Sequence, residues 1–153
     1  MSPDAKSVTG AEPHERQGRI RHGTQDWFAM VGALLCEAAQ RADLPPPLTL
    51  SLVERYTDGA TWPDGLIQGL SLAIAGGEPS FRVGVTAEER GDVTIEITAG
   101  AAYRLNGLES ADPAYAEAVE ASLGNGDMQV TGDIGPFAPW LAAVHDAIVA
   151  RTF

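Results

Sequence analysis

The hydrophobic pattern first takes a helical period. Apolar positions between residues 24 and 43 recur three and four residues apart, which predicts an amphipathic helix. Thr24 stands where a helix N-cap is preferred, and the prolines at 45–47 cannot continue the helix, so we expect it to end near Asp43. The apolar stripe of this helix comprises Trp27, Val31, Leu34, Leu35 and Ala38, broadened by Phe28 and Met30.

Four segments with alternating apolar and polar positions follow. They cover residues 48–56, 70–74, 81–85 and 93–97, and the alternation is typical of half-buried strands. A Gly-Gly-Glu-Pro turn at 76–79 joins the second and third segments as a hairpin. Since turns connect all four segments in sequence, we expect them to form an antiparallel meander.

The helical period returns after the fourth strand. A short helix is predicted over 99–106, and a second begins at Asp112-Pro113, with Asp112 as the N-cap. Met128 and Val130 mark a fifth strand, and Pro136 opens a last helix. The predicted fold class is therefore α+β, with a five-stranded, mainly antiparallel sheet and helices packed on one of its faces.

Length and composition define the predicted domain organisation. The 153 residues fit one ordinary domain, which we place at 24–153. Residues 1–23 are polar, mix glycine, proline and charges, and are expected to form a mobile N-terminal arm. This arm has no apolar core segment, so it is not expected to be a secretory signal.

The net charge of −11 bears on the expected partners. An acidic body repels phosphate groups, which argues against nucleic-acid binding and against stable docking on anionic lipid surfaces. No apolar run approaches the roughly 20 residues needed to span a bilayer, so no stable membrane insertion is expected. The single cysteine, Cys36, excludes an intramolecular disulfide and fits a cytoplasmic location.

Several segments taken together resemble a known family. Phe81-Arg82-Val83-Gly84-Val85, followed by Gly91-Asp92-Val93-Thr94-Ile95, resembles the strand pattern of the sterol carrier protein 2 (SCP2-like) family. The helix that ends at Gly107, the strand 126–133 (Gly-Asp-Met-Gln-Val-Thr-Gly-Asp) and the apolar helix 136–150 are similar to later segments of that family. The similarity is clear over 80–150 and looser over 48–79, where the region 54–69 is longer and richer in glycine and proline.

The resemblance implies a function as well as a fold. SCP2-like proteins bind fatty acyl chains, sterols or other lipids in an apolar cavity between sheet and helices, often within larger enzyme systems. The resemblance implies no cofactor and brings no catalytic motif. The chain ends soon after the last helix without a recognisable peroxisomal address, which weighs against a trafficking role.

Large residues on the inward stripes are the candidate ligand-binding residues. Plain core packing is the alternative for each of them, since an aromatic ring buries about 150–250 Å² wherever it packs. A ligand cavity requires mostly apolar walls with a few polar groups. The candidates are Trp27, Phe28, Val31, Leu52, Phe81, Val83, Tyr103, Tyr115, Phe137, Trp140 and Leu141.

Three polar residues are candidates for acid/base chemistry. Glu54 and Tyr56 are expected at the end of the first strand, where a carboxyl group at a cavity mouth could act as a general base. His145 neighbours Leu141 on the last helix. The alternatives are a solvated strand end for Glu54 and Tyr56, and a boundary histidine bonded to the backbone for His145. No metal-ligand pattern is present in the sequence, and no metal site is predicted.

Three functional hypotheses follow. The first is a non-enzymatic module that binds a sterol, a fatty acyl chain or another apolar small molecule. The second is a small enzyme that acts on an apolar substrate, with Glu54, Tyr56 or His145 as the acid or base. The third is a helper subunit of a larger lipid- or steroid-metabolising enzyme. A partner enzyme and a homodimer both remain open.

Overall fold

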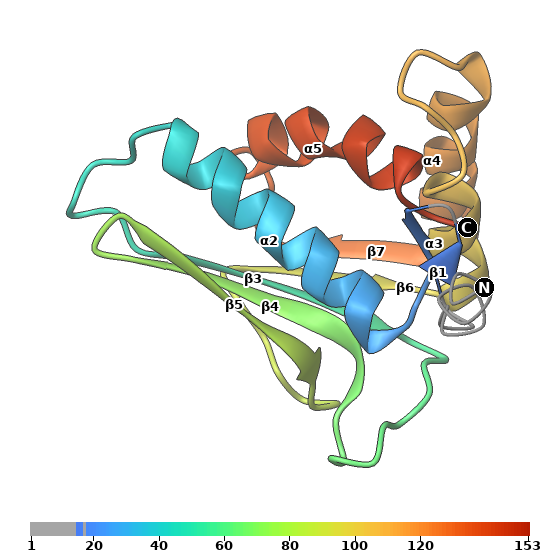
Figure 1. The fold of residues 1–153 in the computed structure, drawn as a ribbon, viewed down its shortest axis with the longest axis horizontal. Helices are drawn as coiled ribbons and strands as arrows, with labels where there is room; N and C mark the ends of the chain where they lie inside the picture. The colour runs from blue at the N-terminus through green and yellow to red at the C-terminus, as the bar shows by residue number, and fades with distance from the viewer. Residues whose placement is uncertain (1–14, 17) are drawn as a thin grey trace, which may run out of the picture.

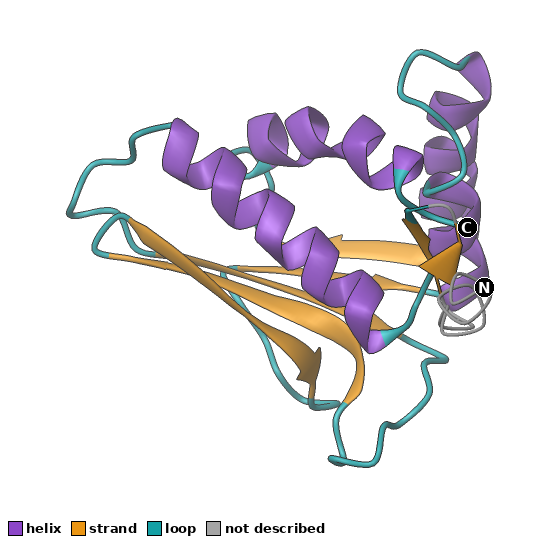
Figure 2. Ribbon diagram, viewed as in Figure 1, coloured by secondary structure: helices purple, strands orange, loops and turns teal. Residues whose placement is uncertain are grey.

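The structure is a computed structural model, and it describes residues 15–16 and 18–153. Its main body is a five-stranded sheet with helices on one face (Figures 1 and 2). The strands of this sheet are β3 (Leu50–Tyr56), β4 (Ile67–Ala75), β5 (Glu78–Val85), β6 (Val93–Ile97) and β7 (Met128–Thr131). The predicted α+β class and the mainly antiparallel sheet are confirmed.

The helices begin and end close to the positions that the sequence predicts. They are α2 (Gln25–Arg41), α3 (Ala99–Leu105), α4 (Pro113–Asn125) and α5 (Ala138–Ala150). Thr24 caps α2 by accepting from the Trp27 N–H, and Asp112 caps α4 by accepting from the Ala114 N–H. Each cap satisfies one of the backbone donors that a helix leaves free at its first turn.

The predicted meander is wrong at one connection. The strand order is β5-β4-β3-β6-β7, so β6 pairs with β3 rather than with β5. The β3–β6 pairing is parallel, from Leu52 opposite Val93 to Tyr56 opposite Ile97. The chain must therefore cross from one edge of the sheet to the other side of its central strand. Turn residues at 86–92 indicate a change of direction, but they do not specify the strand with which β6 pairs.

Arg55 holds this crossover against the back of the sheet. Its side chain is buried and donates to the carbonyl oxygens of Thr86 (3.3 Å) and Glu89 (3.0 Å). It also forms an ion pair with Glu96 at 2.7 Å. The crossover thus covers part of the sheet face that carries no described helix, and the backbone carbonyls that it buries are satisfied.

The opposite face of the sheet holds the main core. α2 lies obliquely across it, α5 lies beside α2, and α3 and α4 stand at one end of the sheet (Figure 1). Most strand positions that the alternation marks as apolar point toward these helices, and many of them are buried. Members of this layer include Leu52, Leu70, Leu72, Ile74, Val93, Ile95 and Ile97.

The two described ends of the chain meet beside α2. β1 (Glu15–Arg16) and β2 (Arg19–Ile20) form a small hairpin, and Ile20 lies opposite Thr152 in a parallel bridge. Of the arm predicted at 1–23, residues 1–14 and 17 lie outside the described residues. The backbone of residues 20–22 hydrogen-bonds to Arg151 and Phe153, so this part is attached to the domain.

Candidate functional site

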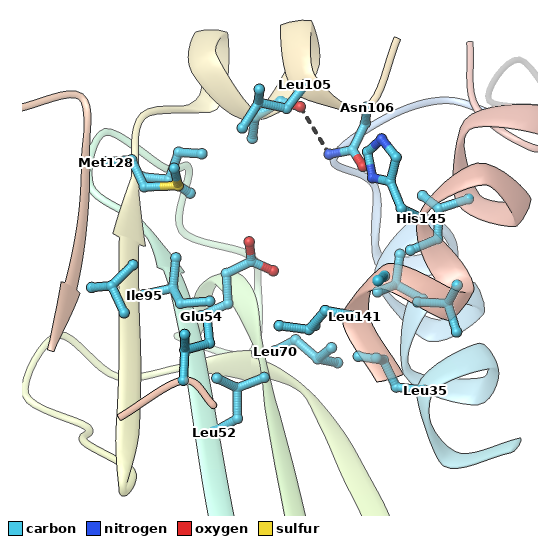
Figure 3. Close-up of a pocket in the computed structure, with 18 of the residues that line it drawn as sticks. Leu35, Leu52, Glu54, Leu70, Ile95, Leu105, Asn106, Met128, Leu141 and His145 are labelled. Carbon is cyan, nitrogen blue, oxygen red and sulfur yellow. Dashed lines mark hydrogen bonds between the residues drawn. The ribbon is translucent and has the colours of Figure 1, made fainter. Parts of the chain in front are cut away.

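A cavity of about 460 Å³ lies between the helix-covered face of the sheet and the helices. Its volume falls in the range of about 300–1,000 Å³ that is typical of small-molecule sites. Most of its walls are aliphatic, and Figure 3 shows the side chains that converge on it. The lining includes Leu35, Leu52, Leu70, Ile95, Leu105, Met128, Leu141 and Ile148.

The floor of the cavity is set by the register of the strands. Leu70 of β4 and Ile95 of β6 flank Glu54 of β3 on either side. The row continues to Val83 at one edge of the sheet and to Val130 at the other. Because residues directly opposite one another share a face, these five side chains form one line across the sheet. Glu54 is the only charged member of that line.

Glu54 lies within the central strand, two residues before its end, and not at the strand end that the sequence predicts. β3 continues through Tyr56, and β6 pairs with it to that point. The Glu54 carboxyl group points into the cavity (Figure 3). Among the described residues, no hydrogen bond or ion pair reaches it. Burial raises its pKa from 4.5 to about 7, because removal from water disfavours the charged form.

Polar groups on the helices form the other part of the cavity lining. Asn106 follows α3, and its Nδ2 donates to the Ala102 carbonyl oxygen at 2.8 Å. His145 of α5 donates from Nε2 to the Leu108 carbonyl oxygen at 2.8 Å, since a carbonyl can only accept. The Tyr115 ring lies 4.4 Å from the His145 ring, centroid to centroid. Burial, followed by the charge of Asp146, raises the Tyr115 pKa.

Exposed lining residues locate the opening of the cavity. Leu123 on α4 is 49% exposed and Val130 on β7 is 36% exposed, although both line the cavity. Ala138 and Ala142 on α5 are exposed lining residues as well. The cavity therefore opens between α4, β7 and the first half of α5, and an apolar molecule could enter there without crossing the sheet.

Some of the residues proposed from the sequence come together in this cavity. Of the ligand-binding candidates, five line it: Trp27, Val31, Leu52, Tyr115 and Leu141. Glu54 and His145, two of the three acid/base candidates, line it as well. Strand alternation and helical spacing placed all of these residues on inward faces, and the tertiary structure places them around one space.

The other candidates lie elsewhere. Phe28, Phe137 and Trp140 are buried in the core but are not among the lining residues. Tyr103 is 57% exposed. Phe81 and Val83 are on β5, at the edge of the sheet, and the Phe81 ring packs directly against Gly32 of α2, where a larger residue would collide with it. The burial of Phe28, Phe137 and Trp140 fits the core-packing alternative, whereas Tyr103 lies largely at the surface.

Tyr56 belongs to an aromatic cluster rather than to the cavity. Its ring packs against Phe28 with centroids 5.2 Å apart, and its hydroxyl group is 2.9 Å from His22 Nε2. Burial lowers the His22 pKa to about 4, so this imidazole is neutral near neutral pH. Burial, and then the charge of Glu54, raises the Tyr56 pKa well above its usual value. In this structure Tyr56 is therefore a packed, hydrogen-bonded core residue.

Sequence reasoning missed the aliphatic part of the site and one polar residue. Alternation predicts strand positions for Leu70, Leu72, Ile95 and Ile97, but it does not mark aliphatic side chains as ligand contacts. For Asn106 the sequence predicts only the end of a helix. The signal that could have found it is its spacing, since it lies one helical turn after the buried Ala102.

The described residues hold neither a candidate metal cluster nor a membrane-spanning helix. No cluster of three or more His, Cys, Asp or Glu side chains that could bind a metal ion occurs in the described part of the chain. Across residues 15–16 and 18–153, no helix combines the length and apolar character needed to cross a bilayer.

Comparison with known proteins gives similar folds at low sequence identity. The chain is similar to a crystal structure of sterol carrier protein 2, at 20% identity, covering 86% of this chain and 98% of that one, with a TM-score of 0.47. It is also similar to a conserved hypothetical protein from Thermus thermophilus, described as possibly a sterol carrier protein, at 18% identity, 92% and 91% coverage and a TM-score of 0.42.

A third similar structure is a much longer protein. A double mutant of the sec-alkyl sulfatase PisA1 matches at 17% identity with a TM-score of 0.43, and the match covers 74% of this chain but 15% of the sulfatase chain. No protein-family model matches the chain. No curated protein matches it either. SCP2 structures recur among the matches, as the resemblance in the sequence predicts.

Proposed function

We propose that this protein binds an apolar small molecule, such as a sterol, a fatty acyl compound or a similar hydrophobic metabolite, between its sheet and its helices. The observation that carries the proposal is the largely aliphatic cavity of about 460 Å³, open to solvent between α4, β7 and α5. Each 100 Å² of apolar ligand surface removed from water favours binding by roughly 2.5 kcal/mol, before the cost of association.

The test combines a ligand with a substitution that fills the cavity. Dodecanol should raise the melting temperature of the wild-type protein, because a ligand that binds only the folded state stabilises it. Leu141→Trp places a larger side chain in the cavity and should remove this shift. Ala143→Trp adds the same side chain at an exposed position of the same helix that does not line the cavity, and should keep the shift.

Either of two results would count against binding in the cavity. A shift that survives in Leu141→Trp would mean that dodecanol binds elsewhere. A wild-type protein that shows no shift with dodecanol or with other hydrophobic compounds, and that releases no apolar molecule on organic extraction, would argue against the proposal as a whole.

A catalytic role is the second candidate, and one observation favours it. A carboxyl group with a pKa of about 7 inside an apolar cavity has the properties of a general base that works near neutral pH. If the protein is an enzyme, Glu54→Gln should abolish turnover of an apolar substrate while the protein still binds it. If it is only a binding protein, no turnover of a bound compound should be detectable in the wild type.

A further inference from the structure

We infer that the molecule bound in this cavity carries a hydroxyl group, and that this group donates a hydrogen bond to the Glu54 carboxyl group. The inference rests on the proposed function and adds to it the chemical class of the ligand. It also predicts which lipids the protein rejects, namely those with an anionic head group.

Glu54 favours, by its position, a ligand that carries a hydrogen-bond donor. Its carboxyl group enters the cavity from the central strand, with Leu70 and Ile95 directly beside it on the neighbouring strands. No described residue donates a hydrogen bond to it. Glu54 is half-buried, so water can still reach its carboxyl group, and a ligand that displaces this water must supply a donor in its place.

Two other polar residues that line the cavity already donate hydrogen bonds within the protein. Asn106 Nδ2 uses one of its two hydrogens on the Ala102 carbonyl oxygen, which leaves one N–H and the acceptor Oδ1. His145 Nε2 already donates to the Leu108 carbonyl oxygen. Glu54 is left as an acceptor that no described residue supplies with a donor, and a ligand with a donor complements it. Tyr115 adds a hydroxyl group, which can donate or accept.

The same arrangement disfavours two other head groups. A carboxylate is an acceptor only, so in the cavity it would face the Glu54 carboxyl group with no cation beside it. The chain as a whole carries a net charge of −11, which also repels anions from the opening. An ammonium group donates, but it must lose its own hydration to enter an apolar cavity, which a neutral hydroxyl group does at much smaller cost.

The experiment compares ligands that share one alkyl chain and differ in the head group. Dodecanol, its methyl ether, dodecanoate and dodecylammonium are titrated into the wild-type protein by calorimetry. Dodecanol should bind roughly tenfold or more tightly than the ether, which can only accept a hydrogen bond. The affinity for dodecanoate should be the weakest, and should fall by about a factor of ten per pH unit above pH 7, as Glu54 ionises.

Two variants of Glu54 and one control make the assignment specific. Glu54→Met removes the acceptor with little change in shape, and should erase the difference between dodecanol and its ether. Glu54→Gln adds an amide donor, and should strengthen the binding of dodecanoate and remove its pH dependence above pH 7. Glu88→Gln makes the same change from carboxyl to amide at an exposed residue of the crossover. This variant should bind all four compounds as the wild type does.

The outcomes separate this inference from the function on which it rests. If all four compounds bind equally well, or if dodecanoate or dodecylammonium binds more tightly than dodecanol, the assignment of a hydroxyl ligand is overturned, while binding in the cavity stands. If none of the compounds binds, the proposed function fails, and the inference fails with it.

Discussion

At the scale of single residues, Glu54 is the most unusual feature of the molecule. It lies in β3 two residues after Leu52, and its side chain enters the same layer as that leucine. A carboxyl group that is fully solvated has an ordinary pKa and costs the folded state little free energy. Here burial raises its pKa to about 7, so its charge at neutral pH depends on small changes in its surroundings.

This residue makes the stability depend on pH in a defined direction. The raised pKa of Glu54 means that the folded state favours the protonated form. That contribution is fully present below pH 4.5 and is lost as the pH rises through 7. The side chain that Glu54→Gln introduces stays neutral at every pH. The free energy of unfolding of this variant, minus that of the wild type, should therefore be up to roughly 3 kcal/mol larger above pH 7 than below pH 4.5.

Urea unfolding of both proteins across this pH range measures the effect. The comparison isolates Glu54, since both proteins keep His22, whose lowered pKa acts in the opposite direction as the pH falls. Glu88→Gln, at an exposed position, should run parallel to wild type. A constant difference between wild type and Glu54→Gln at all pH values would show that the carboxyl group is well solvated.

At the scale of elements, the crossover from β5 to β6 decides the topology. It separates β6 from the hairpin that precedes it and brings it beside β3, so that Glu54 and Ile95 become neighbours. Without this crossover, a meander would place β6 at the edge beside β5. The floor of the cavity therefore depends on a connection whose main attachment, Arg55, lies on the opposite face of the sheet.

Replacement of Arg55 should loosen this crossover. Arg55→Met removes the donor to two backbone carbonyl groups and leaves Glu96 without its cation, at an expected cost of about 3 kcal/mol. Arg82→Met is the matched control, because its ion pair with Glu89 is more exposed and should contribute less than about 1 kcal/mol. Urea unfolding and protease cleavage within 86–92 report the two effects.

At the scale of the whole molecule, the two described ends of the chain hold each other in place. The Ile20 N–H donates to the Arg151 carbonyl oxygen, and the Phe153 N–H donates to the Ile20 carbonyl oxygen. The Trp27 indole donates to the Thr152 hydroxyl oxygen at 2.9 Å. Trp27 also lines the cavity. The last residues of the chain thus fix a side chain of the proposed binding site.

Thr152 tests this connection between the chain end and the site. Thr152→Val keeps the shape of the side chain but leaves the buried Trp27 N–H without an acceptor, which should cost about 1–3 kcal/mol. Thr152→Ser keeps the hydroxyl group and should lose much less. Thermal unfolding compares the two variants, and equal losses in both would mean that packing of the methyl group, rather than the hydrogen bond, is what matters.

The sequence alone determined the elements and the face that each presents to the core. Helix caps, prolines and the period of apolar positions are local signals, so Thr24, Asp112 and the alternating strands were predicted close to their observed positions. The same local pattern placed Leu52, Leu141 and Trp27 on inward faces. It could not separate residues that pack against one another from residues that line an empty space.

The tertiary structure alone decided which strands are neighbours and where the cavity lies. Strand order depends on contacts between distant segments, as the bonds of Arg55 to the crossover show. Aromatic rings such as Phe28 and Tyr56 filled the space under the start of α2, whereas shorter aliphatic side chains left space under α5. The ionisation of Glu54 depends on that space, because a carboxyl group responds to everything that surrounds it in three dimensions.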